Sequence, residues 1–237
     1  MRKKSLRETA VRCVLLLAGL CIAHLGVTVF IQTDLGSDSF NVLIQGLFRS
    51  LPWPEWAGMT HGRVHLLVSL LILLALLAVQ RDCVGIGTVL CMALGGPVID
   101  LFTIVLAPVI HDGLPLLVRL LLLVAGCVIL AFGMTIVISS EAGTGPNDLV
   151  AVVLSQKLKK PFGPVRVAVD LGFTLIGFLL GGVVGLGTVI CAFVVGPAAQ
   201  LFFPVSRKLC GVCLQKFVGS CPPVDGDSYE DLFHSRS

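Results

Sequence analysis

Residues 84–102 read VGIGTVLCMALGGPVIDLF, and residues 184–202 read VGLGTVICAFVVGPAAQLF. With a shift of 100 residues, the two stretches agree at ten of nineteen positions. Each stretch is apolar over a length that crosses about 30 Å of hydrocarbon at about 1.5 Å per residue. Each also contains glycine and proline in its middle, which membrane helices accept and soluble helices seldom do. The repeat therefore predicts a duplicated membrane protein.

The composition of the whole chain also predicts a membrane protein. Hydrophobic residues make up 56% of the chain and charged residues 13%, whereas soluble domains average about 25% charged residues. The basic residues gather at the ends of apolar segments, which membrane topology explains without nucleic-acid binding. We therefore expect the lipid bilayer as a partner and no nucleic acid. Several cysteines fall inside the apolar segments, where they suit packing: Cys13, Cys21, Cys91, Cys127 and Cys191.

The duplication includes the first apolar segment, residues 11–32. A basic start followed by an apolar run also describes a signal peptide, but this run is longer than the usual 7–15 residues or so. A shift of 107 residues matches it to an internal segment through ten identical pairs, beginning with Arg12/Arg119 and ending with Gly36/Gly143. Because a cleaved peptide has no reason to resemble an internal helix, we expect this segment to remain as a membrane span.

Hydropathy predicts six full spans, at residues 11–32, 64–80, 84–107, 114–138, 164–182 and 184–204. Two further apolar segments, 39–51 and 146–156, are too short to cross a bilayer and predict half-helices or interfacial helices. The expected fold is an all-α membrane protein of two three-span repeats, each with an added short helix. Its parts are a basic N-terminal tail 1–10, the repeats 11–112 and 113–204, and a flexible C-terminal tail 205–237.

The distribution of basic residues predicts the orientation of the chain. With the N-terminus in the cytoplasm, fourteen basic residues lie inside and only Arg49, Arg63 and Arg119 lie outside. Both termini are then cytoplasmic. Because each half has an odd number of spans, the halves run in opposite senses across the membrane. Inverted repeats of this kind are typical of many secondary transporters.

The VGIGT and VGLGT motifs begin the repeated helices. They are not dinucleotide-binding loops, because the third glycine and a soluble strand–helix unit are missing. One interpretation places the free N–H groups of each helix start, with Thr88 and Thr188, at a polar cavity. The other is close helix packing through small residues, with the two threonines as caps. The sequence leaves both interpretations open.

Two polar segments, GSDSFN (36–41) and GTGPND (143–148), follow the first span of each repeat. They place Asp38, Asn41, Asn147 and Asp148 beside non-helical backbone near a membrane boundary. Irregular backbone at membrane depth must be buried in protein or line a cavity. The four side chains are therefore candidates for the lining of a solute or ion site. The alternative is that they cap helices at surface turns.

Carboxylates also occur inside the predicted spans, where they are costly. Asp100 is a candidate for a coupling ion or proton because Gln200 replaces it in the second repeat; alternatively, it is hydrated near a helix end. Asp170 lies one helical turn from Arg166, which predicts a structural ion pair. His24 and His65 are expected to serve helix packing or to lie at the membrane interface.

Signatures of enzymes and metal sites are missing from the sequence. It has neither a GxSxG elbow nor an HExxH pair, so we expect no enzyme and no cofactor. Cys210 and Cys213, with Cys221 and His234, have irregular spacing for zinc ligands. We therefore expect no metal.

The two polar loops resemble those of the YczE/YyaS/YitT family of bacterial membrane proteins, specifically its YczE-like branch. A family loop of the form L-G-x-S-P-W-D-V-L is similar to residues 35–43, and one of the form G-x-G-P-x-D-L is similar to residues 143–149. The GIGT and GLGT helices are also similar, and the resemblance covers roughly residues 11–204. It implies a bacterial plasma-membrane location and no particular substrate. Ser39, Phe40 and Asn41 depart from the family's Pro, Trp and Asp, which argues against a role that needs an ionised carboxylate in both loops.

These observations favour a small-solute transporter or permease with its site between inverted repeats. Its lining would include Asp38, Asn41, Asn147 and Asp148, with Thr88, Thr188 and Asp100 as further candidates. The solute or ion is not specified by the sequence. The alternative is a non-transporting accessory or regulatory protein that assembles with another membrane protein, and a second copy of the chain is a further possible partner.

Overall fold

The structure is a computed structural model that describes residues 5–54, 58–80, 84–111, 113–160 and 162–219. These residues form eight helices and no strand, which confirms the all-α prediction. The helices are α1 (Leu6–Thr33), α2 (Ser39–Ser50), α3 (His61–Val79), α4 (Ile86–Leu106), α5 (Leu116–Ser139), α6 (Pro146–Leu158), α7 (Phe162–Leu179) and α8 (Leu186–Val218).

Five helices of the described chain are long and apolar enough to cross a membrane: α1, α3, α4, α5 and α8. The sixth expected span, 164–182, coincides with α7, which has 18 residues and is not among the five. The two short helices are confirmed as α2, with 12 residues, and α6, with 13 residues.

The outer ends of α1 and α8 differ from the expected tails. Helix α1 begins at Leu6, so the last residues of the predicted N-terminal tail are helical. Residues 205–218, expected to be flexible, are instead the last part of α8, which continues through Pro197 and Pro204. A membrane helix tolerates proline where neighbouring helices support it. Here Ser206, Cys210 and Leu214 are buried on one face. The expected tail residues 220–237 lie outside the described part of the chain.

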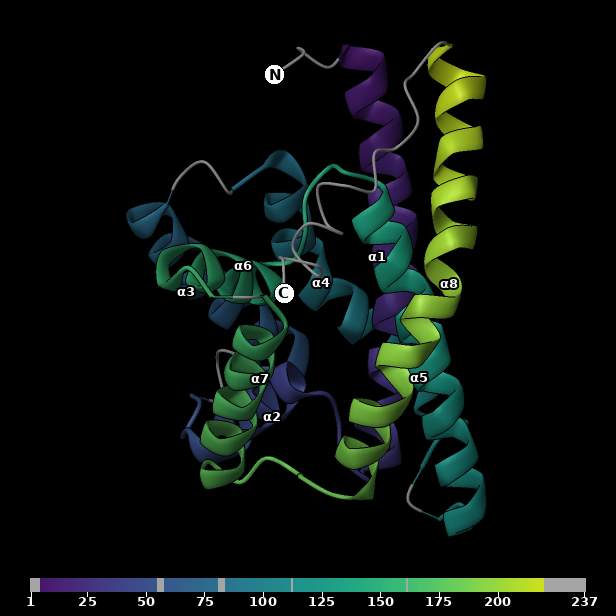
Figure 1. Cartoon of the computed structure of the whole chain (residues 1–237). Coiled ribbons are helices and arrows are strands. Elements are labelled where there is room, and N and C mark those ends of the chain that lie inside the picture. The colour runs from purple at the N-terminus through teal and green to yellow at the C-terminus, as the bar shows by residue number, and fades with distance from the viewer. Residues whose placement is uncertain (1–4, 55–57, 81–83, 112, 161, 220–237) are drawn as a thin grey trace.

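Helices α1, α5 and α8 lie side by side on the right of Figure 1, and the start of α1 and the end of α8 lie at the same end of the molecule. Helices α1 and α5 pack closely through two pairs of glycines. Gly19 contacts Gly133, and Gly26 contacts Gly126. Because the later glycine of α1 meets the earlier glycine of α5, the two helices run antiparallel. Small residues allow this close approach of two backbones.

Each glycine loop caps a helix of the other half. The Gly187 N–H donates to the Leu35 carbonyl at 2.8 Å, and the Gly87 N–H donates to the Ala142 carbonyl at 3.1 Å. These N–H groups belong to the first turns of α8 and α4, where no intrahelical partner exists. The next loop residues, Gly36 and Gly143, have φ values of +117° and +145°, which glycine adopts without strain.

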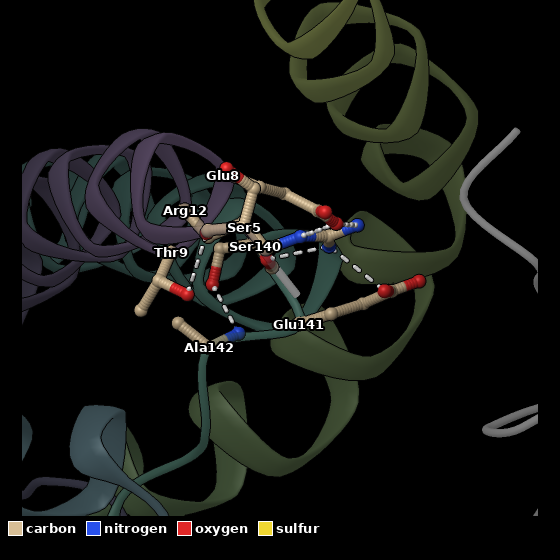
Figure 2. Close-up of polar contacts among 7 residues, drawn as sticks. All are labelled: Ser5, Glu8, Thr9, Arg12, Ser140, Glu141 and Ala142. Atoms are coloured by element: carbon tan, nitrogen blue, oxygen red, sulfur yellow. Dashed lines mark hydrogen bonds and ion pairs between the residues drawn. The ribbon is translucent and has the colours of Figure 1, made fainter. Parts of the chain in front are cut away.

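Helices α1 and α5 are also joined by two arginines, each of which bonds to a carbonyl of the other helix or its cap. Arg12 Nη1 donates to the Ser140 carbonyl at 3.1 Å, and Arg119 Nε donates to the Thr33 carbonyl at 2.9 Å. Arg12 is only 4% exposed, and its guanidinium also pairs with Glu8 at 3.0 Å and Glu141 at 2.8 Å, as Figure 2 shows. Each arginine therefore satisfies a carbonyl at the C-terminal end of the other helix.

Each short helix also packs against a helix of the opposite half. Helix α2 packs on α7, and α6 packs on α3. Residues 40–46 of α2 are all buried, so this part of the helix is enclosed by protein on every side. Gln45 Oε1 of α2 accepts a hydrogen bond from the Val183 N–H at 2.8 Å, between α7 and α8. On the other side, Gln80, at the end of α3, donates to Gln156 of α6 at 2.8 Å.

The repeated Gly-Pro pair, at residues 96–97 and 196–197, allows a matched test of this packing. The backbone of Gly96 in α4 contacts that of Gly62 in α3, whereas nothing lies within 4 Å of a Cβ built on Gly196. We expect Gly96→Ala to lower the free energy of unfolding by about 1–3 kcal/mol because the added methyl group overpacks the contact. Gly196→Ala should have little effect. Thermal unfolding of both variants in detergent measures the difference, and equal effects would contradict the assigned packing.

Candidate functional site

The first polar segment forms a capped helix start. Asp38 has an extended backbone and is the N-cap of α2, a position that aspartate favours. Its carboxylate accepts hydrogen bonds from the Asn41 N–H at 3.4 Å, from Asn41 Nδ2 at 2.8 Å and from the Ser37 hydroxyl at 3.3 Å. Asp38 therefore caps α2, as one of the two interpretations predicts. It is half-buried, and α2 enters the protein interior from this point.

Asn41 connects this cap to α3. Its Oδ1 lies 3.2 Å from His61 Nε2. Because an amide oxygen only accepts hydrogen bonds, His61 carries a proton on Nε2. Asn41 is 4% exposed, so the middle of the chain Asp38–Asn41–His61 lies inside the protein, whereas Asp38 and His61 are half-buried.

The second polar segment forms a charged cluster at the corresponding place. Arg166 Nη1 of α7 donates to Asp148 Oδ1 at 2.6 Å, and Arg166 Nε donates to Asp170 Oδ2 at 2.9 Å. Asn147 Nδ2 adds a hydrogen bond to Asp148 Oδ1 at 3.2 Å. The predicted pair of Arg166 with Asp170 is confirmed. The second partner, Asp148, cannot be predicted from the sequence, because that contact depends on how α6 packs against α7.

The two polar segments share one neighbouring helix. Helix α2, which Asp38 caps, packs on α7, and α6, which Asn147 and Asp148 begin, packs on α7 as well. Four of the predicted residues are thus distributed over two clusters, one at the start of each short helix: Asp38, Asn41, Asn147 and Asp148.

Asp100 takes part in a helix cap. Its carboxylate accepts hydrogen bonds from the Thr60 hydroxyl at 2.5 Å and from the Gly62 N–H at 3.0 Å, at the start of α3. Thr60 and Gly62 are the two chain neighbours of His61. Gln200, at the equivalent position of α8, is exposed. Asp100 therefore stabilises the first turn of α3 and lies beside the Asp38–Asn41–His61 chain.

The threonines of the VGxGT motifs lie where the glycine loops dock. Thr88 is fully buried, and its Oγ1 has no hydrogen-bond partner among the described residues. Thr188 Oγ1 accepts a hydrogen bond from the Gly185 N–H at 3.5 Å. The Gly87 and Gly187 N–H groups are occupied by loop carbonyls. These contacts agree with close packing at both helix starts.

Two histidines that we expected to serve packing lie next to the polar chain. His65 is buried, and its ring lies 5.7 Å from that of His24 and 5.3 Å from that of Phe40, between ring centroids. The spacing of His61 and His65 places both on one face of α3, but the sequence does not show that α1 brings His24 to the same place. Within the described ranges, no group of three or more His, Cys, Asp or Glu side chains is arranged to hold a metal ion. Cys221 and His234, which the sequence analysis considers as zinc ligands, lie outside those ranges.

Removing Arg166 should leave two carboxylates close together without their shared cation. We expect Arg166→Gln to lower the free energy of unfolding by about 1–3 kcal/mol, between the values of exposed and fully buried ion pairs. Adding Asp148→Asn and Asp170→Asn should recover much of this loss because the repulsion disappears. Thermal unfolding of the single and triple variants measures the effect. A triple variant less stable than Arg166→Gln would contradict it.

Burial raises the pKa of the Asp38 carboxyl, and hydrogen bonds from Asn41 and Ser37 lower it by less. The folded protein therefore binds this proton more tightly than the unfolded chain does. Its contribution to stability is complete below the ordinary aspartate pKa of about 3.9 and is lost as the pH rises through the raised value. We expect Asp38→Asn to become more stable relative to the original protein as the pH rises from 4 to 7. Melting temperatures of both proteins across this range measure the trend, and parallel curves would contradict it.

Comparison with known proteins places these loops and helices in a family. A 29% identical protein of Haemophilus influenzae, described as uncharacterized, aligns over 195 residues, with 82% of this chain and 84% of that protein covered. Two Bacillus subtilis proteins are each 25% identical: the uncharacterized membrane protein YczE, covering 92% of this chain and 99% of YczE, and the uncharacterized protein YyaS, covering 80% and 91%.

No solved structure matches the chain. The model of a family of unknown function, DUF6198, matches residues 10–204. This range includes both glycine loops, both VGxGT motifs and all the polar residues of the two clusters. The expected resemblance to YczE-like proteins is confirmed, and the chain belongs to the DUF6198 family of unknown function.

Proposed function

We propose that this protein is a small-solute transporter of the bacterial plasma membrane, built from two inverted repeats with its site between them. In this arrangement α1, α3, α4, α5, α7 and α8 are the six spans, and both termini are cytoplasmic. Helices α2 and α6 enter the membrane without crossing it. The burial of α2 from residue 40 to residue 46 supports this placement, because an interfacial helix would expose one face.

The inverted arrangement is supported by contacts that recur with exchanged roles. Arg12 bonds Ser140 as Arg119 bonds Thr33, and each partner is the equivalent of the other after a shift of 107 residues. The Gly36 loop docks on α8 as the Gly143 loop docks on α4. Because the equivalent helices α1 and α5 run antiparallel, a two-fold axis relating them lies across the helices. With both helices spanning the bilayer, that axis lies in the membrane plane.

The observation that carries the proposal is the cluster of two carboxylates and one guanidinium at α7, the helix on which α2 of the first half packs. Arg166 pairs with Asp148 at 2.6 Å and with Asp170 at 2.9 Å. Ionisable groups within membrane segments usually serve a solute or ion pathway. The excess of carboxylates over guanidinium favours a solute that carries a positive charge. Such a solute would compete with Arg166 for Asp148 and Asp170.

The exchanged contacts suggest how the site would open to each side. Helix α2 belongs to the first half and packs on α7 of the second, while α6 packs on α3 of the first. A rocking movement between the halves therefore shifts both polar segments together. Alternating access by such a movement around a fixed site is the usual mechanism of inverted-repeat transporters.

The second candidate function is that of an accessory protein, and the end of α8 favours it. At 33 residues, α8 is about 50 Å long and exceeds the hydrocarbon thickness of about 30 Å. Its last turns expose Leu209, Val212 and Phe217. Apolar side chains beyond the bilayer suit contact with another membrane protein or a second copy of the chain.

Transport is tested with Asp148→Asn and the matched control Asp34→Asn. Asp34 forms an exposed pair with Arg49, which contributes little to stability, and Asn suits its left-handed backbone (φ 47°). A panel of small cationic solutes is first screened for thermal stabilisation of the purified protein. A solute present at 100 times its Kd should raise the free energy of unfolding by about 2.7 kcal/mol. The best solute is then assayed for uptake into proteoliposomes.

We expect Asp148→Asn to lose both stabilisation and uptake, at least tenfold, while it still reaches the membrane. Asp34→Asn should behave as the original protein. Uptake that is unaffected by Asp148→Asn would contradict the proposed site. The absence of any stabilising solute, together with a partner protein that co-purifies equally with both variants, would favour the accessory function.

A further inference from the structure

His24 and His65 meet between α1, α3 and α4, where His65 is buried and His24 is half-buried. Their rings are nearly perpendicular, at 77°, with centroids 5.7 Å apart. Gly95 of α4 makes room for them, because a Cβ at this position would lie 3.0 Å from His24 Nε2 and 3.2 Å from His65 Cε1. The ring of Phe40 covers His65 from α2. Two imidazoles are thus held in contact by four helices.

Only some of the polar atoms of this pair form hydrogen bonds with other described residues. His24 Nδ1 lies 2.9 Å from the Leu20 carbonyl, so this nitrogen carries the hydrogen and Nε2 keeps its lone pair. His65 Nδ1 and the Ser69 hydroxyl, one helical turn away, have no hydrogen-bond partner among the described residues. His65 is 8% exposed and Ser69 1%. A buried polar group without a partner costs about 1–3 kcal/mol, so packing alone does not account for these atoms.

We propose that His24 and His65 form a proton-binding site in which one proton is shared between the two rings. The site deepens the proposed transport function, on which its role as the coupling site rests. A metal ion is less suitable, because the described residues supply no third His, Cys, Asp or Glu to this pair and transition metals in proteins usually take four ligands.

The chemistry of the pair suits a single proton. A proton taken up by His65 gives an imidazolium N–H, which a small ring rotation would direct at the free Nε2 of His24. No bond other than N–H is made or broken, and the proton returns to water by the reverse path. Binding two protons would place two positive charges side by side at a site where even one is costly.

The surrounding charges connect the pair to the first polar segment. On α3, His61 lies one turn from His65 and bonds Asn41, which bonds Asp38. Asp100 of α4 and Arg49 of α2 act on His61, with opposite effects. From α7, the neighbour of Phe40 is the apolar Phe173. His61, Asn41 and Asp38 are therefore the polar residues that follow His65 from α3 toward the loop.

The test is a pH titration of the full-length protein in lipid nanodiscs, with 15N-labelled histidine followed by NMR. The nitrogens of His24 and His65 should shift together in one step between pH 5 and 8, because they share one proton. His24→Gln should weaken proton binding at His65 by about tenfold, the value of one hydrogen bond of about 1.4 kcal/mol. Gly95→Ala, which separates the rings without removing a titratable group, should have a similar effect.

These measurements need no solute, so they distinguish the proton site from the transport function. A shared step in the original protein supports the site even if no solute is transported. Two histidines that stay neutral from pH 5 to 8, or that titrate independently at the same pH in the original protein and in His24→Gln, would overturn it. The first result is read on the unmodified protein and does not depend on the folding of a variant.

Discussion

The fold depends on one hydrogen bond made twice: a loop carbonyl of one half accepts the N–H of the second glycine in the VGxGT motif of the other half. In a membrane no water can satisfy a helix start, so each free N–H needs a partner from the protein. Leu35 supplies it for Gly187, and Ala142 supplies it for Gly87. The glycine that follows each carbonyl has a positive φ and turns the chain into α2 or α6. The same bond therefore joins the halves and positions both polar segments.

Within this shared frame the two halves carry different chemistry. In the first half, the polar residue in the first turn of the short helix is Asn41, bonded to His61 and Asp38. In the second half, its equivalent is Asp148, bonded to Arg166. The first half also has a carboxylate beside this position, because Asp38 Oδ1 lies 2.8 Å from Asn41 Nδ2. Equivalent backbone positions thus support a hydrogen-bonded chain on one side and an ion-pair cluster on the other.

The sequence predicts features that identical residues at a fixed shift or a single helix can reveal. The shift of 107 residues pairs Arg12 with Arg119, whose contacts are exchanged in the structure, and the helical spacing of Arg166 and Asp170 predicts their ion pair. Contacts between helices are harder to predict from the sequence. The bonds of Asp100 to the start of α3 and of Asp148 to Arg166 depend on how the helices pack, which no local sequence pattern indicates. The sequence does not predict that α8 continues past Pro204, because proline usually marks a helix end. In the structure, a 2.7 Å hydrogen bond between Ser206 and Thr135 joins this continuation to α5.

Labelling of single cysteines from one side of the membrane tests the inverted arrangement most directly. Ser50 and Lys157 are equivalent positions near the ends of α2 and α6, and both are exposed. Ser50→Cys and Lys157→Cys are treated in intact cells with a membrane-impermeant maleimide, and labelling of the native cysteines in the original protein is subtracted. We expect Ser50→Cys to be labelled in intact cells and Lys157→Cys only after permeabilisation. Labelling of both from the same side would contradict the account.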